Sequence, residues 1–450
     1  MSRDVMRRFS LVLAVLLSGW AVSAGNWPQY RGPQARGVDD TRPAPVSWNV
    51  ETGENVRWRT PIPGLAHASP VVWSNRVYAA TAVKPGESSL KIGLYGDIEP
   101  VAESDPNEWR LLCLDRDSGT VVWNTLAYTG IPRVKRHTKA THCNSTPAVD
   151  GQRVVAILGS EGLFCFGLDG RLLWRRDLGP MDSGYFQVPS AQWGFASSPV
   201  LHDGKVVVQC DVQTNSFVAV FDAADGREIW RTARQEVPTW CTPTVVETAG
   251  RRQIVVNGWK HIGGYDLATG AELWRLNGGG DIPVPTPFLA HDLIFLTSAH
   301  GKLRPLRAIR PTASGDITPA DPAQTNAAIA WVHPRQGAYM QTPIVVGEQL
   351  WSCTDSGVLT CVDARTGVIR YSERLATGGG QGYTASPVSD GRNLYFTSEL
   401  GNVFVVPARP EFAVLTVNTL GESCLSTPAL SDGTLFFRTR SQVVAVGSAP

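Results

Sequence analysis

Short apolar stretches alternate with glycine-containing turns along most of the chain. An apolar pair such as Val71-Val72 or Ile344-Val345 leads into a turn such as Asp203-Gly204, and a β-branched or aromatic stretch such as Val206–Val208 follows. Apolar runs on either side of an Asp-Gly pair are typical of β-hairpins, because glycine supplies the positive φ that a tight turn needs. The pattern predicts an all-β chain of short strands.

A Ser-Pro or Thr-Pro pair opens each repeating unit and sets its length. The steps between the eight prolines are 77, 52, 44, 44, 56, 44 and 41 residues. A period near 44 lies in the range of a four-stranded propeller blade, so we expect one blade for each pair. These anchor pairs are Ser69-Pro70, Thr146-Pro147, Ser198-Pro199, Thr242-Pro243, Thr286-Pro287, Thr342-Pro343, Ser386-Pro387 and Thr427-Pro428.

A second signature ends the third strand of several units and begins the fourth. It consists of Asp, four residues, Gly, four residues and Trp. Three regular copies are Asp115/Gly119/Trp123, Asp222/Gly226/Trp230 and Asp266/Gly270/Trp274. A single four-stranded sheet cannot bury both of its faces, whereas sheets stacked around an axis bury one another. We expect each tryptophan to pack its large apolar surface against the next blade.

The two ends of the chain predict how the ring closes. Trp58 lies 11 residues before Ser69, a spacing close to the 12 residues that separate Trp230 from Thr242. Residues near 56–60 therefore resemble an outer strand with no inner strands before it, and the last unit lacks such a strand. We predict an eight-bladed β-propeller of four-stranded antiparallel blades, closed by this N-terminal outer strand. It would form a single domain over residues 49–450, preceded by an arm at 25–48.

Residues 1–24 have the pattern of a signal peptide rather than of folded structure. Arg3, Arg7 and Arg8 precede the apolar run Phe9–Leu17, and small residues end the segment at Ala24. The run is about half of the ~20 residues that a membrane-spanning helix needs. No cysteine precedes Cys113, which excludes a lipid-modified N-terminus. We expect a periplasmic or secreted protein without a membrane span.

Composition narrows the choice of partners. The 450 residues include 41 basic and 40 acidic side chains, a balance that argues against a nucleic-acid-binding protein. We expect a monomer. Eight cysteines in an exported chain invite a disulfide interpretation, but Cys113 and Cys361 occupy equivalent apolar positions and favour core packing. A Cys353–Cys361 disulfide is the alternative.

Several of these motifs resemble a known family. The opening Trp27–Pro33, of sequence WPQYRGP, the eight anchors and the Asp-Gly-Trp turns are similar to those of the PQQ-like β-propeller repeat family. This family belongs to the quinoprotein alcohol dehydrogenase-like superfamily. The resemblance covers nearly the whole chain and implies the fold, but it does not fix an activity. The superfamily includes quinone-dependent dehydrogenases and BamB-like assembly scaffolds that hold no cofactor.

The dehydrogenase interpretation makes specific demands on the residues. The resemblance implies a quinone beside a calcium ion, held by carboxylate and amide ligands, with a catalytic Asp, a stacking Trp and adjacent cysteines. This chain has no adjacent cysteine pair, and its repeated aspartates occupy structural turns, so that Asp281 and Asp316 are the remaining candidates. We therefore expect no catalytic residue, no metal and no bound cofactor. PQQ with calcium is the alternative.

The extra length of three repeats predicts where ligands bind. Insertions at 128–142 and 181–195 should open at the channel mouth, and a third at 311–330 should fall on the opposite face. Aromatic, histidine and amide side chains near the mouth suggest a pocket for a polar or anionic ligand. Its predicted residues are His67, His142, Asn144, Trp193, Trp240, Lys260, His261, Tyr339, Gln341 and Tyr383. Alternatively, the tryptophans only fill the channel, or His67, His142 and His261 hold a metal.

A basic loop adjoins this predicted pocket. Arg133, Lys135, Arg136 and Lys139 form a candidate surface for an anionic partner, with a solvated surface as the alternative. Taken together, the sequence predicts an exported scaffold that binds an unidentified protein or a polar small molecule. A PQQ-dependent dehydrogenase with an atypical active site is the second hypothesis.

Overall fold

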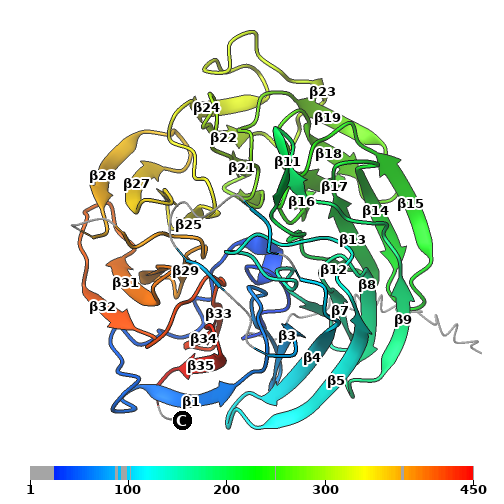
Figure 1. Ribbon diagram of the computed structural model, residues 1–450. Helices are drawn as coiled ribbons and strands as arrows, with labels where there is room; N and C mark the ends of the chain where they lie inside the picture. Colours follow the sequence, from blue (N-terminus) through cyan, green and yellow to red (C-terminus); the bar gives the residue numbers. More distant parts are fainter. Residues whose placement is uncertain are drawn as a thin grey trace, which may run out of the picture.

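Eight blades stand around a central axis in the computed structural model, as Figure 1 shows. Each is a four-stranded antiparallel sheet, and one of them has an additional fifth strand. Residues 25–86, 90–92, 99–101, 103–248, 250–376 and 380–448 are described, so the predicted signal peptide lies outside them. The prediction of an eight-bladed propeller is confirmed. Within the described residues no helix is long and apolar enough to cross a membrane.

Each blade runs from a short inner strand to an outer strand. Blades one to four are β2 (Val71–Trp73), β3 (Arg76–Val83), β4 (Asn107–Asp115), β5 (Val121–Gly130); β6 (Ala148–Val149), β7 (Arg153–Ile157), β8 (Leu163–Gly167), β9 (Leu172–Arg176); β12 (Val200–His202), β13 (Lys205–Cys210), β14 (Phe217–Asp222), β15 (Glu228–Ala233); and β16 (Thr244–Thr248), β17 (Arg251–Val256), β18 (Ile262–Asp266), β19 (Glu272–Leu276).

Blades five to eight complete the ring. They are β20 (Phe288–Ala290), β21 (Leu293–Thr297), β22 (Leu306–Ile309), β24 (Ile329–His333); β25 (Ile344–Val346), β26 (Gln349–Cys353), β27 (Val358–Asp363), β28 (Ile369–Arg374); β29 (Val388–Ser389), β30 (Asn393–Thr397), β31 (Asn402–Pro407), β32 (Thr416–Thr419); and β33 (Ala429–Ser431), β34 (Thr434–Arg438), β35 (Gln442–Val446), β1 (Val56–Pro61). A separate hairpin, β10 (Gly184–Tyr185) and β11 (Val188–Gln192), follows blade two.

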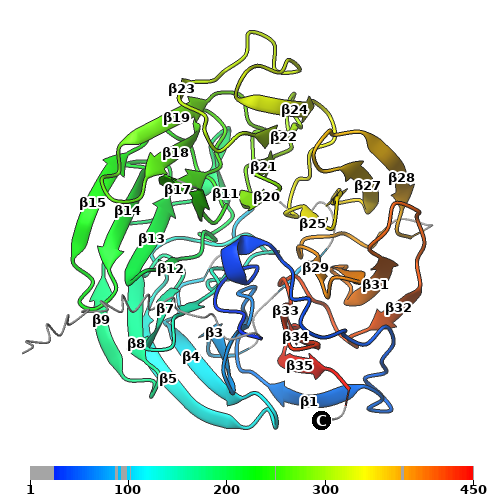
Figure 2. The ribbon, with the colours of Figure 1, turned by 180° about the vertical axis from the view of Figure 1, so that it is seen from behind.

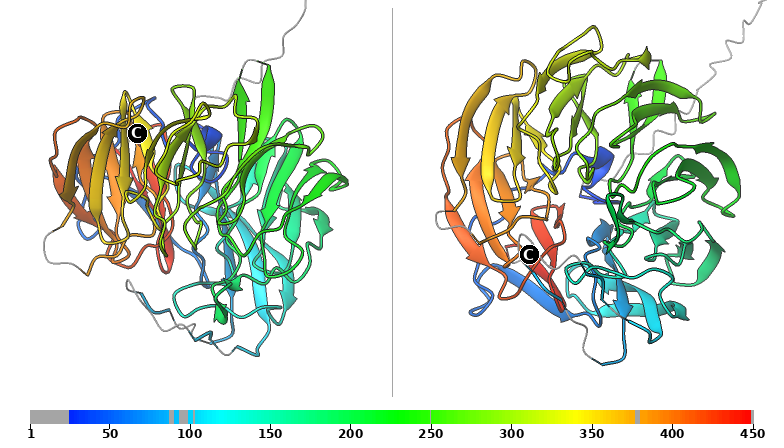
Figure 3. Two further views of the ribbon diagram at one scale, coloured as in Figure 1. Left: turned by 90° about the horizontal axis from the view of Figure 1, so that it is seen from above. Right: turned by 45° about the horizontal axis from the view of Figure 1, so that its top comes forward.

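The eighth blade closes the ring with strands from both ends of the chain. Strand β1 pairs antiparallel with β35, and Trp58 stands opposite Ala445. Figure 3 shows this blue strand beside the red C-terminal strands. The predicted closure is confirmed, and it makes the first and last segments depend on each other for a complete sheet.

The tryptophans of the outer strands join neighbouring blades. The indole of Trp174 donates a hydrogen bond to the carbonyl of Ala223 (3.0 Å) in the next blade and lies over Gly226. Gly226 has φ +70°, and a Cβ atom there would lie 2.6 Å from the indole. Glycine therefore serves both the turn and the docking of the ring. Trp58, Trp123, Trp230 and Trp331 dock in the same way.

Blade five departs from this pattern because it carries the 311–330 insertion. Trp274 of blade four donates to Gln253 Oε1 (2.8 Å) within its own blade instead of to a turn of the next one. From the insertion, β23 (Gly315–Asp316) pairs in parallel with β19 and adds a fifth strand to blade four. The insertion thus forms part of the outer edge of its neighbour.

The anchor pairs form a ring of hydrogen bonds around the axis. The backbone N–H of Ser69 donates to the hydroxyl of Thr146 (3.0 Å), whose own N–H donates to Ser198 (2.9 Å). Four further blade junctions repeat this bond. At these six junctions the serine or threonine accepts a buried N–H from the preceding blade, which favours this residue type at the anchor.

The N-terminal arm covers the axis on one face of the ring. Arg31 is fully buried and donates hydrogen bonds to the carbonyls of Pro387 (3.1 Å) and Pro343 (2.9 Å) in two different blades. The short 3-10 helix η1 (Pro33–Ala35) follows it and lies near the centre of the ring in Figure 2. The sequence around Tyr30 and Arg31 therefore serves to close one end of the channel.

All eight cysteines are buried free thiols. Burial raises the pKa of Cys143 to about 12, which keeps the thiol protonated and unreactive. The expectation of core packing is confirmed, and the alternative of a Cys353–Cys361 disulfide is contradicted because both thiols are free.

Candidate functional site

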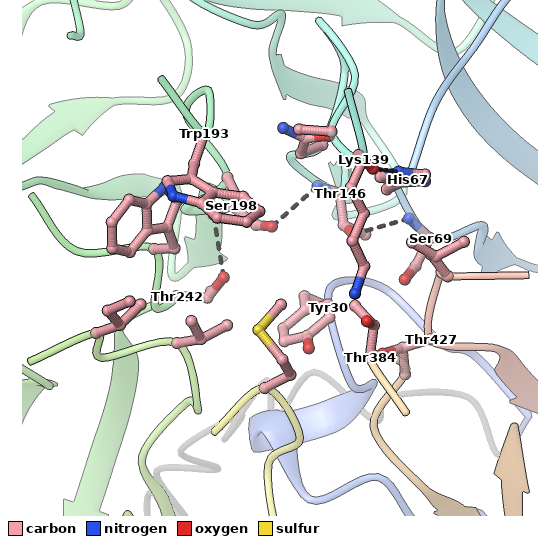
Figure 4. A pocket seen from close by; sticks show the side chains of 18 of the residues that line it. Tyr30, His67, Ser69, Lys139, Thr146, Trp193, Ser198, Thr242, Thr384 and Thr427 are labelled. Atoms are coloured by element: carbon pink, nitrogen blue, oxygen red, sulfur yellow. Dashed lines mark hydrogen bonds between the residues drawn. The ribbon is translucent and has the colours of Figure 1, made fainter. Parts of the chain in front are cut away.

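A cavity of about 160 Å³ lies on the axis, and Tyr30 of the N-terminal arm is part of its lining. Two tiers of repeat positions line it. The upper tier is the residue two positions before each anchor, one from every blade: His67, Asn144, Ala196, Trp240, Val284, Met340, Thr384 and Leu425. The lower tier consists of the anchors Ser69, Thr146, Ser198, Thr242 and Thr427. Figure 4 shows labelled members of both tiers around the cavity.

The N-terminal arm fills the remaining part of the lower tier. Tyr30 lines the cavity, and its hydroxyl lies 3.2 Å from Ser386 Oγ. The anchors of blades five to seven (Thr286, Thr342 and Ser386) do not line the cavity. The anchors that line the cavity therefore come from five consecutive blades, from blade eight round to blade four, and the cavity has one hydroxyl-rich side.

Polarity differs between the two sides of the cavity. Blades four to six contribute an apolar wall that contains Trp240, Ile282, Val284 and Met340. Trp193, from the loop after β11, lines the rim and stacks on His137, with ring centroids 4.0 Å apart. The amphipathic lining suits a ligand with one apolar face and several polar edges.

The lining is electrically neutral. His67 Nε2 lies 2.8 Å from the carbonyl oxygen of Lys139 and therefore donates to it. Desolvation by burial lowers the pKa of His67 to about 4, and the nearby positive charge of Lys139 acts in the same direction. At neutral pH the imidazole is uncharged. Lys139, the one lining residue with a permanent charge, lies 2.6 Å from the carboxylate of Glu399.

Half of the ten predicted pocket residues line this cavity. They are His67, Asn144, Trp193, Trp240 and Tyr339. Asn144 accepts hydrogen bonds from the backbone and the hydroxyl of Thr141, which holds its side chain in place. The indole of Trp240 donates to the carbonyl of Gly194 (3.0 Å). The other five residues have different surroundings.

Three of these residues are directed into the protein instead. His142 Nε2 lies 2.7 Å from the carboxylate of Glu103, Gln341 donates to the carbonyl of Ala385 (2.7 Å), and Tyr383 is buried against Phe404. Glu103 is buried, which by itself would raise its pKa. Hydrogen bonds from His142 and Arg136 outweigh this effect and hold the pKa of Glu103 at about 2.

The remaining two lie further out on the mouth. His261 Nε2 is 2.6 Å from the carboxylate of Glu272, on the outer strand β19. Lys260 is exposed, with its ammonium 5.7 Å from the ring of Trp259. His67, His142 and His261 thus have three different partners, and the arrangement does not support the alternative of a metal site made from them.

The basic loop is largely neutralised by the protein's own carboxylates. Arg133 pairs with Asp177 (2.8 Å), buried Arg136 with Glu103 (2.7 Å), and Lys139 with Glu399. Lys135 is exposed. These pairs attach the loop to the ring, so its cations are engaged in structure rather than presented together to an anionic partner.

Five upper-tier residues were missed in the sequence: Ala196, Val284, Met340, Thr384 and Leu425. The signal that would have found them is positional, because each stands two residues before its anchor. Four of the five are apolar, and an apolar side chain does not by itself indicate a binding site. The anchors mark the start of each repeat in the sequence, and five of them also line the cavity.

The donor set of the cavity does not fit a calcium-bound quinone. Calcium takes six to eight oxygen ligands, usually including carboxylates. Among the described residues that line the cavity there is no Asp or Glu. The repeated aspartates act in turns, as when Asp115 accepts the N–H groups of Asp117 and Ser118. Of the two remaining candidates, Asp281 accepts from Gln187 (3.1 Å) outside the lining and Asp316 lies in β23.

One cluster elsewhere has metal-ligand geometry. Among the described residues it consists of His202, Asp203 and Glu247, all half-buried or exposed. Arg252 forms ion pairs with both carboxylates. The guanidinium therefore already neutralises the charge that a cation would need.

Comparison with known proteins places the chain in a family. A family model described as outer membrane protein assembly factor BamB matches residues 165–410, more than half of the chain. No curated protein matches the chain in sequence.

Among solved structures, BamB from Moraxella catarrhalis is similar with a TM-score of 0.55 and 14% identity, over 81% of this chain and 98% of that one. The quinohemoprotein alcohol dehydrogenase from Comamonas testosteroni is similar with a TM-score of 0.62 and 11% identity, over 94% and 81%. At such identities the likeness concerns the fold alone. With the repeat anchors, the docked tryptophans and the family match together, this chain belongs to the BamB-type PQQ-like β-propeller family.

Proposed function

We propose that this protein is an exported, monomeric scaffold that binds its ligand or protein partner at the mouth cavity and holds no quinone. It would consist of the arm 25–48 and a single propeller domain over 49–450, released after cleavage of residues 1–24. The observation that carries this proposal is the neutral, carboxylate-free lining of the cavity.

The physical reason concerns charge. PQQ carries three carboxylates, and burying an anion without compensating charge is costly. Lys139 already pairs with Glu399, and His67 is kept neutral. A tricarboxylate in this cavity would therefore meet hydroxyl groups and apolar side chains but no cation of its own. The family match to BamB also supports a scaffold role, and it does not depend on the charges of the cavity lining.

A PQQ-dependent dehydrogenase is the second candidate, because quinoprotein dehydrogenases share the fold. If PQQ and calcium did bind, the quinone would supply the redox chemistry. The chain offers Trp193 or Trp240 for stacking, but no carboxylate in the lining to bind calcium or accept a proton.

Thermal unfolding of the purified protein with PQQ and calcium separates the two functions. A ligand that binds the native state stabilises it by about RT ln(1 + [L]/Kd), so saturating cofactor would raise the Tm clearly. We expect no shift from PQQ, calcium or both. A shift that requires both, together with reduction of a dye by alcohols or sugars, would show that the protein is an enzyme.

A further inference from the structure

The hydrogen-bonding groups of the cavity are unbalanced toward donors. Four anchor hydroxyls, those of Thr146, Ser198, Thr242 and Thr427, each accept a backbone N–H from the preceding blade. None of them donates its own proton to an acceptor among the described residues. A hydroxyl with one lone pair used in this way still has a proton to donate. The arc of anchors therefore presents O–H groups that lack acceptors.

Ser69 is the most informative of the five lining anchors. It is 2% exposed and lines the cavity, yet its hydroxyl forms no hydrogen bond with any described residue. The oxygen is not enclosed by the protein, so its proton can be donated to a group in the cavity. Beside it, His67 donates through Nε2, which leaves Nδ1 of the neutral ring as an acceptor.

A row of aromatic side chains continues outward from the cavity. It consists of Tyr339, His300, Tyr185, Phe186 and Trp259, and we call it the aromatic row. Successive ring centroids are 5.8, 5.7, 5.2 and 4.3 Å apart. Tyr339 also lines the cavity, and every member is half-buried or exposed. The row therefore connects the cavity with the β10–β11 hairpin over part of the mouth.

Polar groups border the row as they border the cavity. Asp281 accepts from Gln187 Nε2 (3.1 Å) and lies 3.5 Å from the Tyr185 hydroxyl, while Lys260 lies over Trp259. The negative and positive side chains balance, so the row has no net charge from this pair. Apolar ring surface with a polar border and no net charge matches the neutral, amphipathic lining of the cavity.

We propose that the mouth binds an uncharged oligosaccharide, with a terminal sugar in the cavity and the following sugars along the aromatic row. This rests on the proposed function, because it names the ligand of the same scaffold site. A sugar ring has an apolar C–H face for Trp240 and Met340 and hydroxyl edges for the anchors. Its hydroxyls both accept from Ser69 and donate to His67 Nδ1.

The closed end of the cavity favours a glycan over a polypeptide. The N-terminal arm covers the far end of the axis through Arg31, so a polymer cannot pass through the ring, and an end that enters the cavity stops there. The terminus of a polypeptide is charged, and the lining offers no unpaired charge to receive it. The non-reducing end of a neutral glycan carries no charge.

Calorimetric titration of the full-length protein with defined oligosaccharides tests the proposal. The probes are cellohexaose, maltohexaose and hexa-N-acetylchitohexaose, with hexagalacturonate as the acidic counterpart and an uncharged, end-capped hexapeptide as the polypeptide. We expect at least one neutral hexasaccharide to bind at least tenfold more tightly than hexagalacturonate. Failure of all three at millimolar concentration, equal binding of the acidic glycan, or binding of the peptide alone would overturn the proposal.

Ser69→Ala tests the donor arc without disturbing the fold. Because the Ser69 hydroxyl has no partner in the protein, its removal should leave the Tm unchanged while it weakens glycan binding about two- to tenfold, the effect of one neutral hydrogen bond. Thr286→Val is the control, since Thr286 Oγ1 is another anchor hydroxyl without a partner among the described residues, but it is buried and lies outside the cavity. Equal affinity of the Ser69→Ala variant and the wild type would contradict the assignment.

Trp259→Ala tests the aromatic row through chain length. It should weaken binding of the hexasaccharide but not of the corresponding disaccharide, which would reach only the cavity. Phe412→Ala removes a half-buried ring from another aromatic pair, with Tyr371 at 5.5 Å, and should change neither affinity. A loss that is the same for both sugar lengths would refute the role of the row. The scaffold proposal is tested separately with PQQ, so failure of one does not decide the other.

Discussion

Acidification should destabilise the fold through His67 in a way that a single substitution removes. Desolvation by burial lowers the pKa of this imidazole to about 4 from its usual 6.5, and the positive charges of Lys139, Arg438 and Arg136 act in the same direction. The unfolded state therefore binds more protons than the native state between pH 6.5 and pH 4. Stability must fall as the pH decreases through this range.

The two pKa values set the size of the effect. At pH 5 the unfolded imidazole is almost fully protonated and the native one is about one-tenth protonated, which corresponds to a loss of about 2 kcal/mol. At pH 7 the same difference is close to zero. The loss of about 2 kcal/mol is an upper bound, because the imidazole ring is partly exposed to the cavity.

Urea unfolding at pH 7 and pH 5 measures this quantity. The wild type should lose about 2 kcal/mol more than His67→Gln, whose amide keeps a donor for the Lys139 carbonyl but does not titrate. His333→Gln removes another ring bonded to a carbonyl, that of Gly367, and serves as the control for this loss. Identical pH dependence in the wild type and His67→Gln would refute the assignment of His67 as a buried neutral base.

Three further outcomes follow from the packing. In urea unfolding, Gly226→Ala should lower the free energy of unfolding by about 2–4 kcal/mol more than Gly204→Ala does. Both glycines have positive φ, but only a Cβ at position 226 would lie against Trp174. Equal losses in the two variants would contradict the docking of Trp174. Trp58→Ala should cost about 3–5 kcal/mol through ring closure, and a change in Tm near zero would show that β1 contributes little. With a thiol reagent, fewer than one cysteine should react in the native protein and all eight in urea, whereas rapid native labelling would contradict their burial.

The fold could be predicted because its determinants repeat. A Ser or Thr at six of the eight anchors accepts a neighbouring N–H, and a Gly in five turns admits a tryptophan, so the same two contacts determine the sequence at many positions. Even the closure by β1 followed from one spacing, that of Trp58 from its anchor. Blade five carries the 311–330 insertion, and there the step between anchors lengthens to 56 residues.

The site was only half predictable, for a physical reason. Predicted residues such as Gln341 and Tyr383 precede their anchors, but at offsets of one and three residues, and their side chains are buried within the blades. The offset of two faces the axis in all eight blades, whatever the side chain, so the apolar Val284 and Leu425 line the cavity unnoticed. Chemical type indicated candidates, whereas backbone geometry decided which of them lie on the axis.

The role of the N-terminal arm could not be derived from periodicity. Its sequence occurs once, and nothing in the repeat shows which blades it covers. The structure places Tyr30 beside Ser386 and bonds Arg31 to the carbonyls of Pro343 and Pro387. This single segment makes an eightfold ring asymmetric and leaves five hydroxyl anchors on one side of the cavity.

The central claim is that the cavity holds an uncharged ligand and no quinone. Calorimetric titration of the purified protein with PQQ in the presence of calcium tests it most directly. The account predicts no heat of binding, because the lining offers neither carboxylates for calcium nor an unpaired cation for the quinone carboxylates. Calcium-dependent binding in the micromolar range would contradict it and establish a quinoprotein.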